Sequence, residues 1–127
     1  MTIWLERALV VAMHDELLAQ HGGAEGVRDE GLLESALARP LNYASYGEPD
    51  VAELAAIYAI AIARNHPFVD GNKRAAWGAL VTFMAVNGSE LEAPDVEAVM
   101  IMLRMAAGDV PDNEFVDWVR AHAKDPG

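Results

Sequence analysis

Hydrophobic positions recur with a helical period along most of the chain, and glycine-rich or polar breaks separate the stretches. Spacing of this kind predicts amphipathic helices. The first stretch repeats every four residues and consists of Leu5, Leu9, Met13 and Leu17. Gly22 and Gly23 follow as its stop signal. No stretch alternates between apolar and polar residues for long, so the pattern gives no clear indication of a sheet.

A second helix is predicted over residues 30–39. Asp29 stands where it can cap the first turn, and Pro40 lies just beyond the end. The next segment, 40–50, reads PLNYASYGEPD, and its two prolines, one glycine and two tyrosines are typical of a loop or flap. The inward-facing residues of the helix are Leu32, Leu33, Ala36 and Leu37.

Two central helices are predicted to be apolar on nearly every side. The first begins beside Pro49, carries Asp50 and Glu53 in or next to its first turn, and continues past Ile62. The second begins near residue 72 and ends near residue 86, where Asn87 and Gly88 provide a stop. A helix that is apolar all round is normally buried. We therefore expect this pair to form the centre of the molecule.

Two more helices are predicted over residues 94–107 and 111–123, each opened by a proline and an aspartate. Residues 124–127 form a tail that we expect to fray. Together the segments predict an all-α fold in one domain, residues 1–127. It is a bundle of about six helices with a loop or flap at 40–50.

The composition restricts the class of protein. A length of 127 residues suits one domain with a buried core, and the absence of cysteine excludes disulfides and thiolate zinc sites. The first 18 residues include four charged residues and lack a basic start, so we expect neither a signal peptide nor a membrane span, and a cytoplasmic location. A formal net charge of −11 argues against direct binding to nucleic acid or membranes, but leaves room for a local basic site.

Basic residues are concentrated in the stretch RNHPFVDGNKRA, residues 64–75. It holds three of the nine lysines and arginines of the chain: Arg64, Lys73 and Arg74. The last two fall in the first turn of a predicted helix, where cations cost about 0.3–1 kcal/mol each because the helix dipole is positive there. A bound anion, commonly phosphate, offsets that cost. Gly71 lets such an anion approach the backbone closely.

The same stretch carries groups suited to phosphoryl or nucleotidyl transfer. His66 offers an imidazole, the side chain that most often serves as a general base, and can take a proton from a hydroxyl group. Asp70 offers a hard oxygen ligand for Mg²⁺, the usual companion of nucleotide phosphates, or alternatively caps the following helix. Pro67 stiffens the loop, and Phe68 is expected to anchor it in the core.

Written as His-x-Phe-x-Asp-x-Asn-Lys-Arg, the pattern at 66–74 resembles the signature of the Fic/Doc family. The segments GGAEGVRDEGLLESALARP at 22–40 and VNGSEL at 86–91 are similar to its Doc, or death-on-curing, branch. The resemblance covers nearly the whole chain. Two departures from the Fic pattern match the Doc branch. Lys73 stands where Fic enzymes usually have a second glycine, and Trp77 stands where they have a later arginine.

The resemblance implies a Fic/Doc-like fold and the toxin of a type II toxin–antitoxin module. Its partner would be a Phd-type antitoxin whose disordered tail docks on the toxin. It also implies a kinase that uses Mg²⁺ and transfers the γ-phosphate of ATP to a threonine hydroxyl of elongation factor Tu, which halts translation. Lys73 would fill space that Fic enzymes leave for phosphates, so the nucleotide would bind inverted. By position, the loop 40–50 would be a flap that clamps the target as an added strand.

Carried over residue by residue, the family roles give two catalytic residues. His66 would be the general base on the acceptor hydroxyl, and Asp70 would bind magnesium or orient the acceptor. The residues around the phosphates would be Gly71, Asn72, Lys73 and Arg74.

Two alternatives remain open. Gly71 is the Fic-like choice at its position, so the chain is alternatively a Fic-type AMP-transferase that modifies a protein hydroxyl group. The other alternative is a catalytically idle module that only binds an antitoxin. A protein that only binds a partner has no use for a phosphate site, which speaks against this alternative.

Other conspicuous residues have structural interpretations. Arg28 is expected to pair with nearby acids, and Arg64 to stabilise a helix C-terminus. His14 and Asp15 form the dipeptide of HD phosphohydrolases, but no histidine precedes them as that fold requires. The residues expected to serve as core packing are Trp4, Trp77, Trp118, Met100, Met102 and Met105.

Overall fold

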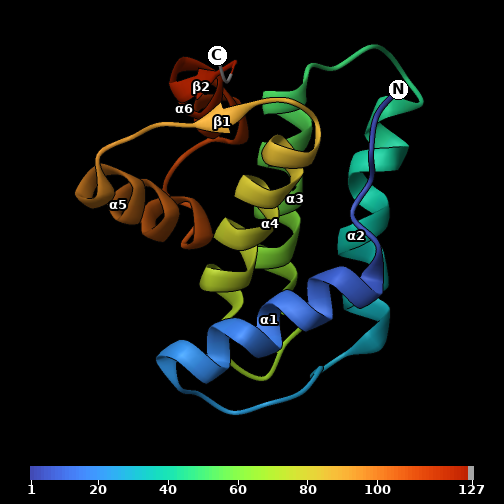
Figure 1. Cartoon of the computed structure of the whole chain (residues 1–127), viewed down its shortest axis with the longest axis vertical. Helices are drawn as coiled ribbons and strands as arrows, with labels where there is room; N and C mark the ends of the chain where they lie inside the picture. Colours follow the sequence, from blue (N-terminus) through green and yellow to red (C-terminus); the bar gives the residue numbers. More distant parts are fainter. Residues whose placement is uncertain (126–127) are drawn as a thin grey trace.

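The computed structural model describes residues 1–125, and within them the fold is almost entirely helical, as predicted (Figure 1). The helices are α1 (Arg7–His21), α2 (Glu30–Ala44), α3 (Val51–Asn65), α4 (Asn72–Val86), α5 (Asp95–Ala106) and α6 (Asp112–His122), and the strands are β1 (Glu90–Leu91) and β2 (Ala123–Lys124). None of these helices is long and apolar enough to cross a membrane.

Helices α3 and α4 form the centre of the bundle and run antiparallel side by side (Figure 1). Helices α2 and α6 pack against α3, and α1 packs against α4. Every residue of α3 from Leu54 to Ala63 is buried, which confirms a helix that is apolar on nearly every side. The loop between α3 and α4, residues 66–71, therefore starts and ends on the most buried elements of the molecule.

The buried face of α1 lies one residue away from the apolar stripe that predicts the helix. Val10, His14 and Leu18 are buried, whereas Leu9 is 46% exposed. Met13 lies at the edge of the buried face. The pattern of apolar residues did not reveal this face, because the residue in its middle, His14, is polar.

Helix α2 has the predicted N-cap, Asp29, but continues beyond its predicted end, through Pro40 to Ala44. Pro40 is buried, on the same face as Leu33 and Leu37. A proline inside a helix removes one backbone hydrogen bond and commonly ends the helix. Here its ring extends the buried face, and the helix continues past it. The predicted loop is correspondingly shorter.

A two-stranded antiparallel sheet, which the sequence did not predict, lies near the end of the chain. Its strands pair Glu90 with Lys124. Lys124 also forms an ion pair with Glu92, so it is ordered, contrary to the expected frayed tail. Strands of two residues are too short to leave an alternating pattern in the sequence. Residues 126–127 of that tail lie outside the described residues.

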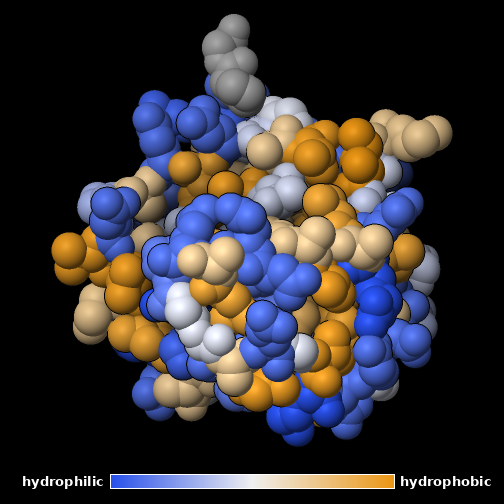
Figure 2. All heavy atoms as spheres, turned by 60° about the horizontal axis from the view of Figure 1, so that its bottom comes forward, coloured by the Kyte–Doolittle hydropathy of each residue, from blue (hydrophilic) through white to orange (hydrophobic). Residues whose placement is uncertain are grey.

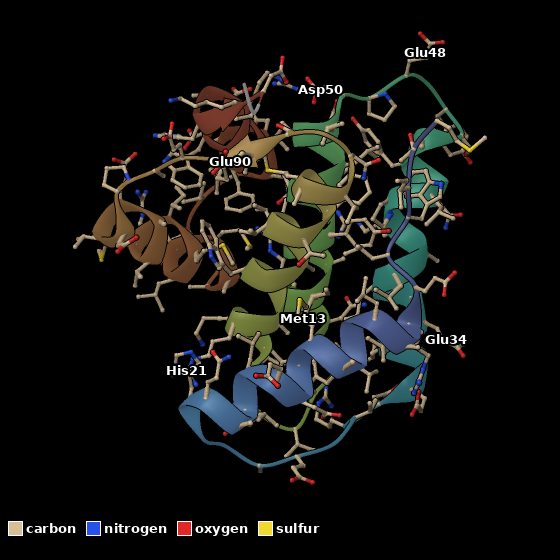
Figure 3. All side chains as sticks on the ribbon, viewed as in Figure 1. Met13, His21, Glu34, Glu48, Asp50 and Glu90 are labelled. Carbon is tan, nitrogen blue, oxygen red and sulfur yellow. The ribbon has the colours of Figure 1, made fainter. Side chains whose placement is uncertain are left out.

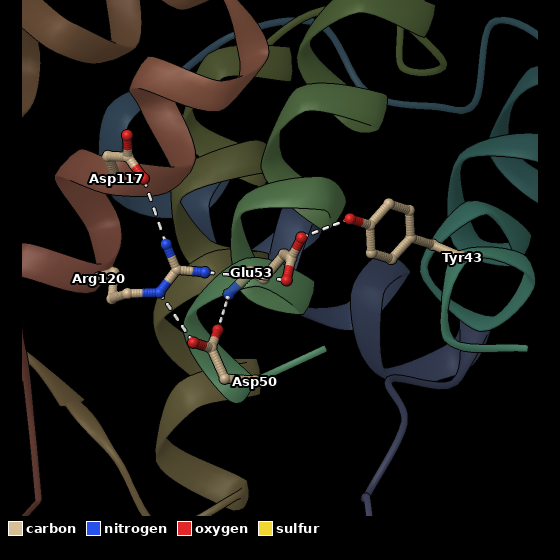
Figure 4. Close-up of polar contacts among 5 residues, drawn as sticks. All are labelled: Tyr43, Asp50, Glu53, Asp117 and Arg120. Atoms are coloured by element: carbon tan, nitrogen blue, oxygen red, sulfur yellow. Dashed lines mark hydrogen bonds and ion pairs between the residues drawn. The ribbon is translucent and has the colours of Figure 1, made fainter. Parts of the chain in front are cut away.

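A polar cluster fastens the N-terminus of α3 to α6 and α2 (Figure 4). The side chain of Asp50 caps α3 by accepting a hydrogen bond from the backbone N–H of Glu53 at 2.8 Å, and it accepts another from Nε of Arg120 at 2.8 Å. Arg120 also pairs with Asp117, and Glu53 accepts a hydrogen bond from the hydroxyl group of Tyr43. The cluster lies at the end of α3 opposite to the loop that leads into α4 (Figure 1).

The large side chains at the periphery pack less deeply than predicted. The three tryptophans are partly buried against the core and are Trp4, Trp77 and Trp118. Met102 and Met105 are buried as expected, but Met100 is 53% exposed. Met100 lies on an outer face of α5, where no element among the described residues covers it.

Candidate functional site

The loop formed by residues 66–71 places the candidate residues where α3 ends and α4 begins. His66 adopts the left-handed conformation, with φ 54° and ψ 52°, and its side chain is exposed. Gly71 is also left-handed, with φ 73°. This conformation costs a residue with a side chain about 1–2 kcal/mol. Contacts with the surrounding protein must therefore hold His66 in place.

Asn72 fixes the loop from inside. It is 4% exposed, and its side-chain oxygen accepts a hydrogen bond from the backbone N–H of Phe68 at 2.9 Å. Its amide nitrogen donates to the carbonyl of Phe68 at 3.0 Å and to Nδ1 of His66 at 3.1 Å. The side chain is thus engaged within the loop, and only the backbone N–H of Asn72 is left for a phosphate. The expected place of Asn72 beside the phosphates stays a prediction.

The hydrogen bond from Asn72 decides which nitrogen of His66 meets a substrate. The two bonds to Phe68 fix the orientation of the carboxamide, so its NH₂ group must point at Nδ1. Nδ1 then accepts the hydrogen bond, and the neutral imidazole carries its proton on Nε2. Nε2 is the ring nitrogen that remains for a substrate.

Phe68 anchors the loop in the core, as predicted, and is fully buried. Its ring stacks on that of His14 from α1, with 3.8 Å between the ring centroids and 11° between the planes. His14 is 1% exposed, and its Nε2 donates to the backbone carbonyl of Asp70 at 2.7 Å. Sequence reasoning missed this supporting residue. The available signal was a polar residue between Val10 and Leu18 on one helix face.

The segment that precedes α2, residues 22–29, crosses the loop and binds its backbone. The backbone N–H of Arg28 donates to the carbonyl of Pro67 at 2.7 Å. The guanidinium group of Arg28 donates to the carbonyls of His66 at 2.8 Å and Asn65 at 3.1 Å. Arg28 therefore binds the partnerless carbonyls at the C-terminus of α3, where a cation is favourable. The expectation that it pairs with acids is wrong.

Asp70 is exposed, and backbone amides hold its carboxylate. One oxygen accepts a hydrogen bond from the N–H of Gly71 at 2.8 Å, and the other from the N–H of Ala24 at 3.4 Å. These bonds, with Arg74 nearby, lower the pKa of Asp70 below its ordinary value of 3.8, so the group is charged at neutral pH. Asp70 does not cap α4, whose N-cap is Gly71 and which has no side-chain cap.

The charged carboxylate of Asp70 suits Mg²⁺ that arrives with a nucleotide, because this ion is commonly bound by one or two carboxylates together with phosphate oxygens. Among residues 1–125, no three histidine, aspartate or glutamate side chains gather in an arrangement that could hold a metal ion by themselves.

Lys73 and Arg74 lie exposed in the first turn of α4, as predicted. Within residues 1–125, neither forms an ion pair with an acid. The first turn of α4 contains no acid, whereas those of α2, α3, α5 and α6 do. Two cations and the first backbone N–H groups therefore make this end of α4 a positive patch on an acidic chain.

Arg64 belongs to the same stretch of sequence but points away from this patch. Its guanidinium group pairs with Asp112 at 2.5 Å and donates to the carbonyl of Met105 at 3.3 Å. Arg64 is structural, as predicted, but its contacts join the C-terminal end of α3 to α5 and to the start of α6.

The loop expected to serve as a flap does not lie beside the site. Residues 45–50 lead into the N-terminus of α3, whereas His66 ends its C-terminus (Figure 1). Helix α3 has 15 residues, so about 22 Å separate its ends. The segment beside the site is 22–29. Composition marked 40–50 as irregular but could not tell at which end of α3 it lies.

A family model described as the Fic/DOC family matches residues 4–84. The chain belongs to the Fic/DOC family. The match includes the whole loop and its supports in α1, and it ends within α4, so α5 and α6 lie outside it.

Two named proteins are similar in sequence to this chain of the Fic/DOC family. Toxin Doc of Mycolicibacterium smegmatis is 47% identical over 74 residues, which cover 57% of each chain. Protein kinase doc of Escherichia phage P1 is 30% identical over 113 residues, which cover 87% of this chain and 88% of the phage protein. The chain thus matches little more than half of the first relative and most of the second.

Proposed function

We propose that this chain is the toxin of a toxin–antitoxin module and a kinase that transfers the γ-phosphate of ATP to a protein hydroxyl group. One arrangement carries the proposal. Lys73 and Arg74, without an acidic partner within residues 1–125, lie at a helix N-terminus next to the exposed imidazole of His66. The names Toxin Doc and Protein kinase doc of two similar proteins support the same function.

Each residue of the site has its own task in this reaction. Lys73, Arg74 and the first backbone N–H groups of α4 hold phosphate oxygens. Asp70 would hold Mg²⁺, and the ion would supply positive charge to the transferring group. His66 receives the proton of the acceptor hydroxyl at Nε2. For Nε2 to be free, the ring's own proton must move through solvent from Nε2 to Nδ1, and the hydrogen bond that Asn72 donates to Nδ1 must break.

The proposed acceptor is a threonine of elongation factor Tu, and the proposed regulator is a Phd-type antitoxin that binds through a disordered tail. Both proposals rest on the resemblance to the Doc branch. Modification of a translation factor halts protein synthesis, which fits a toxin. Both partners are cytoplasmic, and the proposal therefore places this chain in the cytoplasm.

Label transfer to purified elongation factor Tu separates the kinase from its rival. We expect transfer from ATP labelled in the γ-phosphate and none from ATP labelled in the α-phosphate. Transfer of the α label alone identifies an AMP-transferase, the second candidate, which Gly71 favours because it is the Fic-like residue at its position. Transfer of neither label by a chain that still binds the antitoxin identifies an idle binding module.

Replacing His66 separates chemistry from folding. We expect His66→Ala to reduce the rate of label transfer by ~10²–10⁴, the usual effect of losing a general base. The thermal unfolding temperature should change little, because the imidazole is exposed. An unchanged rate in a folded variant removes His66 from the mechanism.

A further inference from the structure

The loop between α2 and α3 forms one wall of an open pocket at the end of α3 opposite to His66. The pocket has a volume of about 410 Å³. Its walls come from the C-terminal end of α2, the loop and the first turn of α3. The lining residues are Tyr43, Tyr46, Gly47, Glu48, Pro49 and Glu53. We call this site the tyrosine pocket.

Both aromatic rings of the tyrosine pocket are accessible. Tyr46 is 91% exposed, and Tyr43 is 46% exposed. The hydroxyl group of Tyr43 donates a hydrogen bond to the carboxylate of Glu53, which holds that ring at the wall of the pocket (Figure 4). The face of a tyrosine ring attracts a cation that lies within about 6 Å of its centre. The rings therefore favour a positively charged ligand group.

The charges of the tyrosine pocket favour the same kind of group. Among the described residues, its lining contains the carboxylates of Glu48 and Glu53 and no lysine or arginine. Within residues 1–125, Glu48 forms no ion pair. Figure 3 shows its carboxylate at the outer edge of the loop. Two ring faces beside two carboxylates suit the cationic end of an arginine or lysine side chain.

A second hollow, of about 360 Å³, adjoins the tyrosine pocket and shares Tyr43 and Glu53 with it. Both arginines in its lining are already paired with acids. Its apolar lining residues are Ile57, Ile60 and Val116. The second hollow therefore offers apolar surface directly beside a site for a cation.

We propose that the tyrosine pocket and the second hollow bind a segment of a partner protein in which a basic side chain stands next to an apolar one. The basic side chain lies against Tyr43 and Tyr46, with Glu48 beside it, and the apolar one covers the floor of the second hollow. The net charge of −11 attracts a basic segment from a distance. A free polyamine matches only the first part, because it has no apolar side chain for the second.

This surface and the candidate site lie at opposite ends of α3 (Figure 1). Figure 2 turns the end with the candidate site forward and shows hydrophilic and hydrophobic side chains interspersed over it. A segment bound at residues 43–53 leaves that end open. The inference consequently does not depend on the proposed kinase activity.

An NMR titration of the isotope-labelled chain with a capped peptide, acetyl-Gly-Arg-Leu-Gly-amide, tests this surface. We expect saturable shifts of the backbone amide signals at residues 43–57. Replacing the arginine of the peptide by citrulline, which has a similar shape but no charge, should weaken binding. Replacing its leucine by glycine should weaken binding as well, because the second hollow then stays empty.

Variants of the chain locate the contacts. Tyr46→Ala should weaken peptide binding about two- to fivefold, the size of an exposed cation–π contact, whereas Tyr46→Phe keeps the ring and should not. Glu48→Gln should also weaken it. The matched control is Glu34→Gln, which removes an exposed acid of α2 outside both linings (Figure 3) and should change nothing. Because Tyr46 and Glu48 are exposed, their replacement should leave the fold intact.

Several results would overturn this inference. One is the absence of saturable shifts at residues 43–57, and another is unchanged binding by Tyr46→Ala. Equal weakening by Glu34→Gln indicates only a general attraction to an acidic surface. Spermidine that binds at the same residues as tightly as the peptide identifies a polyamine site instead. His66→Ala should bind the peptide like the unaltered chain, so a failed kinase assay and a failed peptide titration are distinguishable.

Discussion

At the scale of residues, the site depends on how His66 is held. Among residues 1–125 it is the only residue other than glycine with a positive φ. Asn72 bonds its ring and Arg28 bonds its carbonyl, so the side chain and the backbone have separate supports. Both supports are themselves positioned by backbone hydrogen bonds to the loop. The orientation of the imidazole is therefore built into the folded chain.

The position of the proton on His66 can be measured by nitrogen NMR. At alkaline pH we expect the proton on Nε2, because the amide group of Asn72 donates to Nδ1. Asn72→Asp should move the proton to Nδ1, since a carboxylate only accepts hydrogen bonds. A proton on Nδ1 in the unaltered protein contradicts the orientation of Asn72 described above.

The pairing of His14 with the loop can be divided into its two contacts. His14→Phe keeps a ring against Phe68 but removes the hydrogen bond to the carbonyl of Asp70, so we expect a loss of about 0.5–1.5 kcal/mol in the free energy of unfolding. His14→Ala also removes the stacked ring and should cost about 2–5 kcal/mol. Urea unfolding measures both losses. If His14→Phe and His14→Ala lose the same free energy of unfolding, the stacking of the ring on Phe68 contributes nothing, contrary to this expectation.

At the scale of elements, local signals decided what the sequence could predict. The observed bounds of α4 coincide with the predicted ones because Gly71 and Asn87 mark its ends. The predicted end of α2 was wrong. Pro40 is a local signal for a helix end, but the helix continues past it because Pro40 packs into the core, and that packing depends on the rest of the fold.

The candidate site divides in the same way. The loop residues were found from their chemical pattern. The contact of His14 with Asp70 joins positions 56 apart in the chain, and the contact of Arg28 with His66 joins positions 38 apart. Neither contact has a local signature, so only the packing of α1 and of the segment before α2 reveals them.

The cap of α3 makes a pH-dependent contribution to stability. Partial burial raises the pKa of Asp50, but hydrogen bonds from Arg120 and from the backbone N–H of Glu53 outweigh it and hold the pKa below 3.8. The contribution is therefore complete at neutral pH and is lost as the pH falls through the lowered pKa.

Asp50→Ala should consequently reduce the free energy of unfolding at pH 7 by about 1 kcal/mol, the usual value of an N-cap. The ion pair with Arg120 adds little, because both side chains are about half exposed. Urea titrations should show the difference between variant and unaltered chain shrinking as the pH falls below the ordinary pKa of aspartate and vanishing once Asp50 is protonated. A difference that persists there indicates that the carboxylate charge is not its cause.

At the scale of the whole molecule, the site and the N-terminal strap, residues 1–6, attach to opposite ends of α4. Asn87 follows the C-terminal end of that helix and binds the strap. Its side chain accepts a hydrogen bond from the N–H of Ile3 at 2.7 Å and donates to the carbonyls of Ile3 at 2.9 Å and Phe83 at 2.8 Å. Stability and activity should therefore respond separately to changes at the two ends.

Asn87→Ala tests this separation. We expect the loss of these hydrogen bonds to cost about 1–3 kcal/mol and to lower the thermal unfolding temperature by several degrees. The affinity for ATP should stay the same at a temperature where the variant is folded. A parallel fall in ATP affinity shows instead that the two ends of α4 are coupled.

The left-handed backbone at His66 also has a consequence for cells that carry this gene. Glycine adopts that conformation without the steric cost of a side chain, and asparagine is among the few other residues that visit it routinely. Exchange for either one removes the imidazole and relaxes the chain at the same time. Cultures forced to make a harmful protein select for harmless copies. If the chain is the proposed toxin, survivors that still contain soluble protein should therefore be enriched in these two exchanges, so that escape follows the substitutions that the fold accepts most easily.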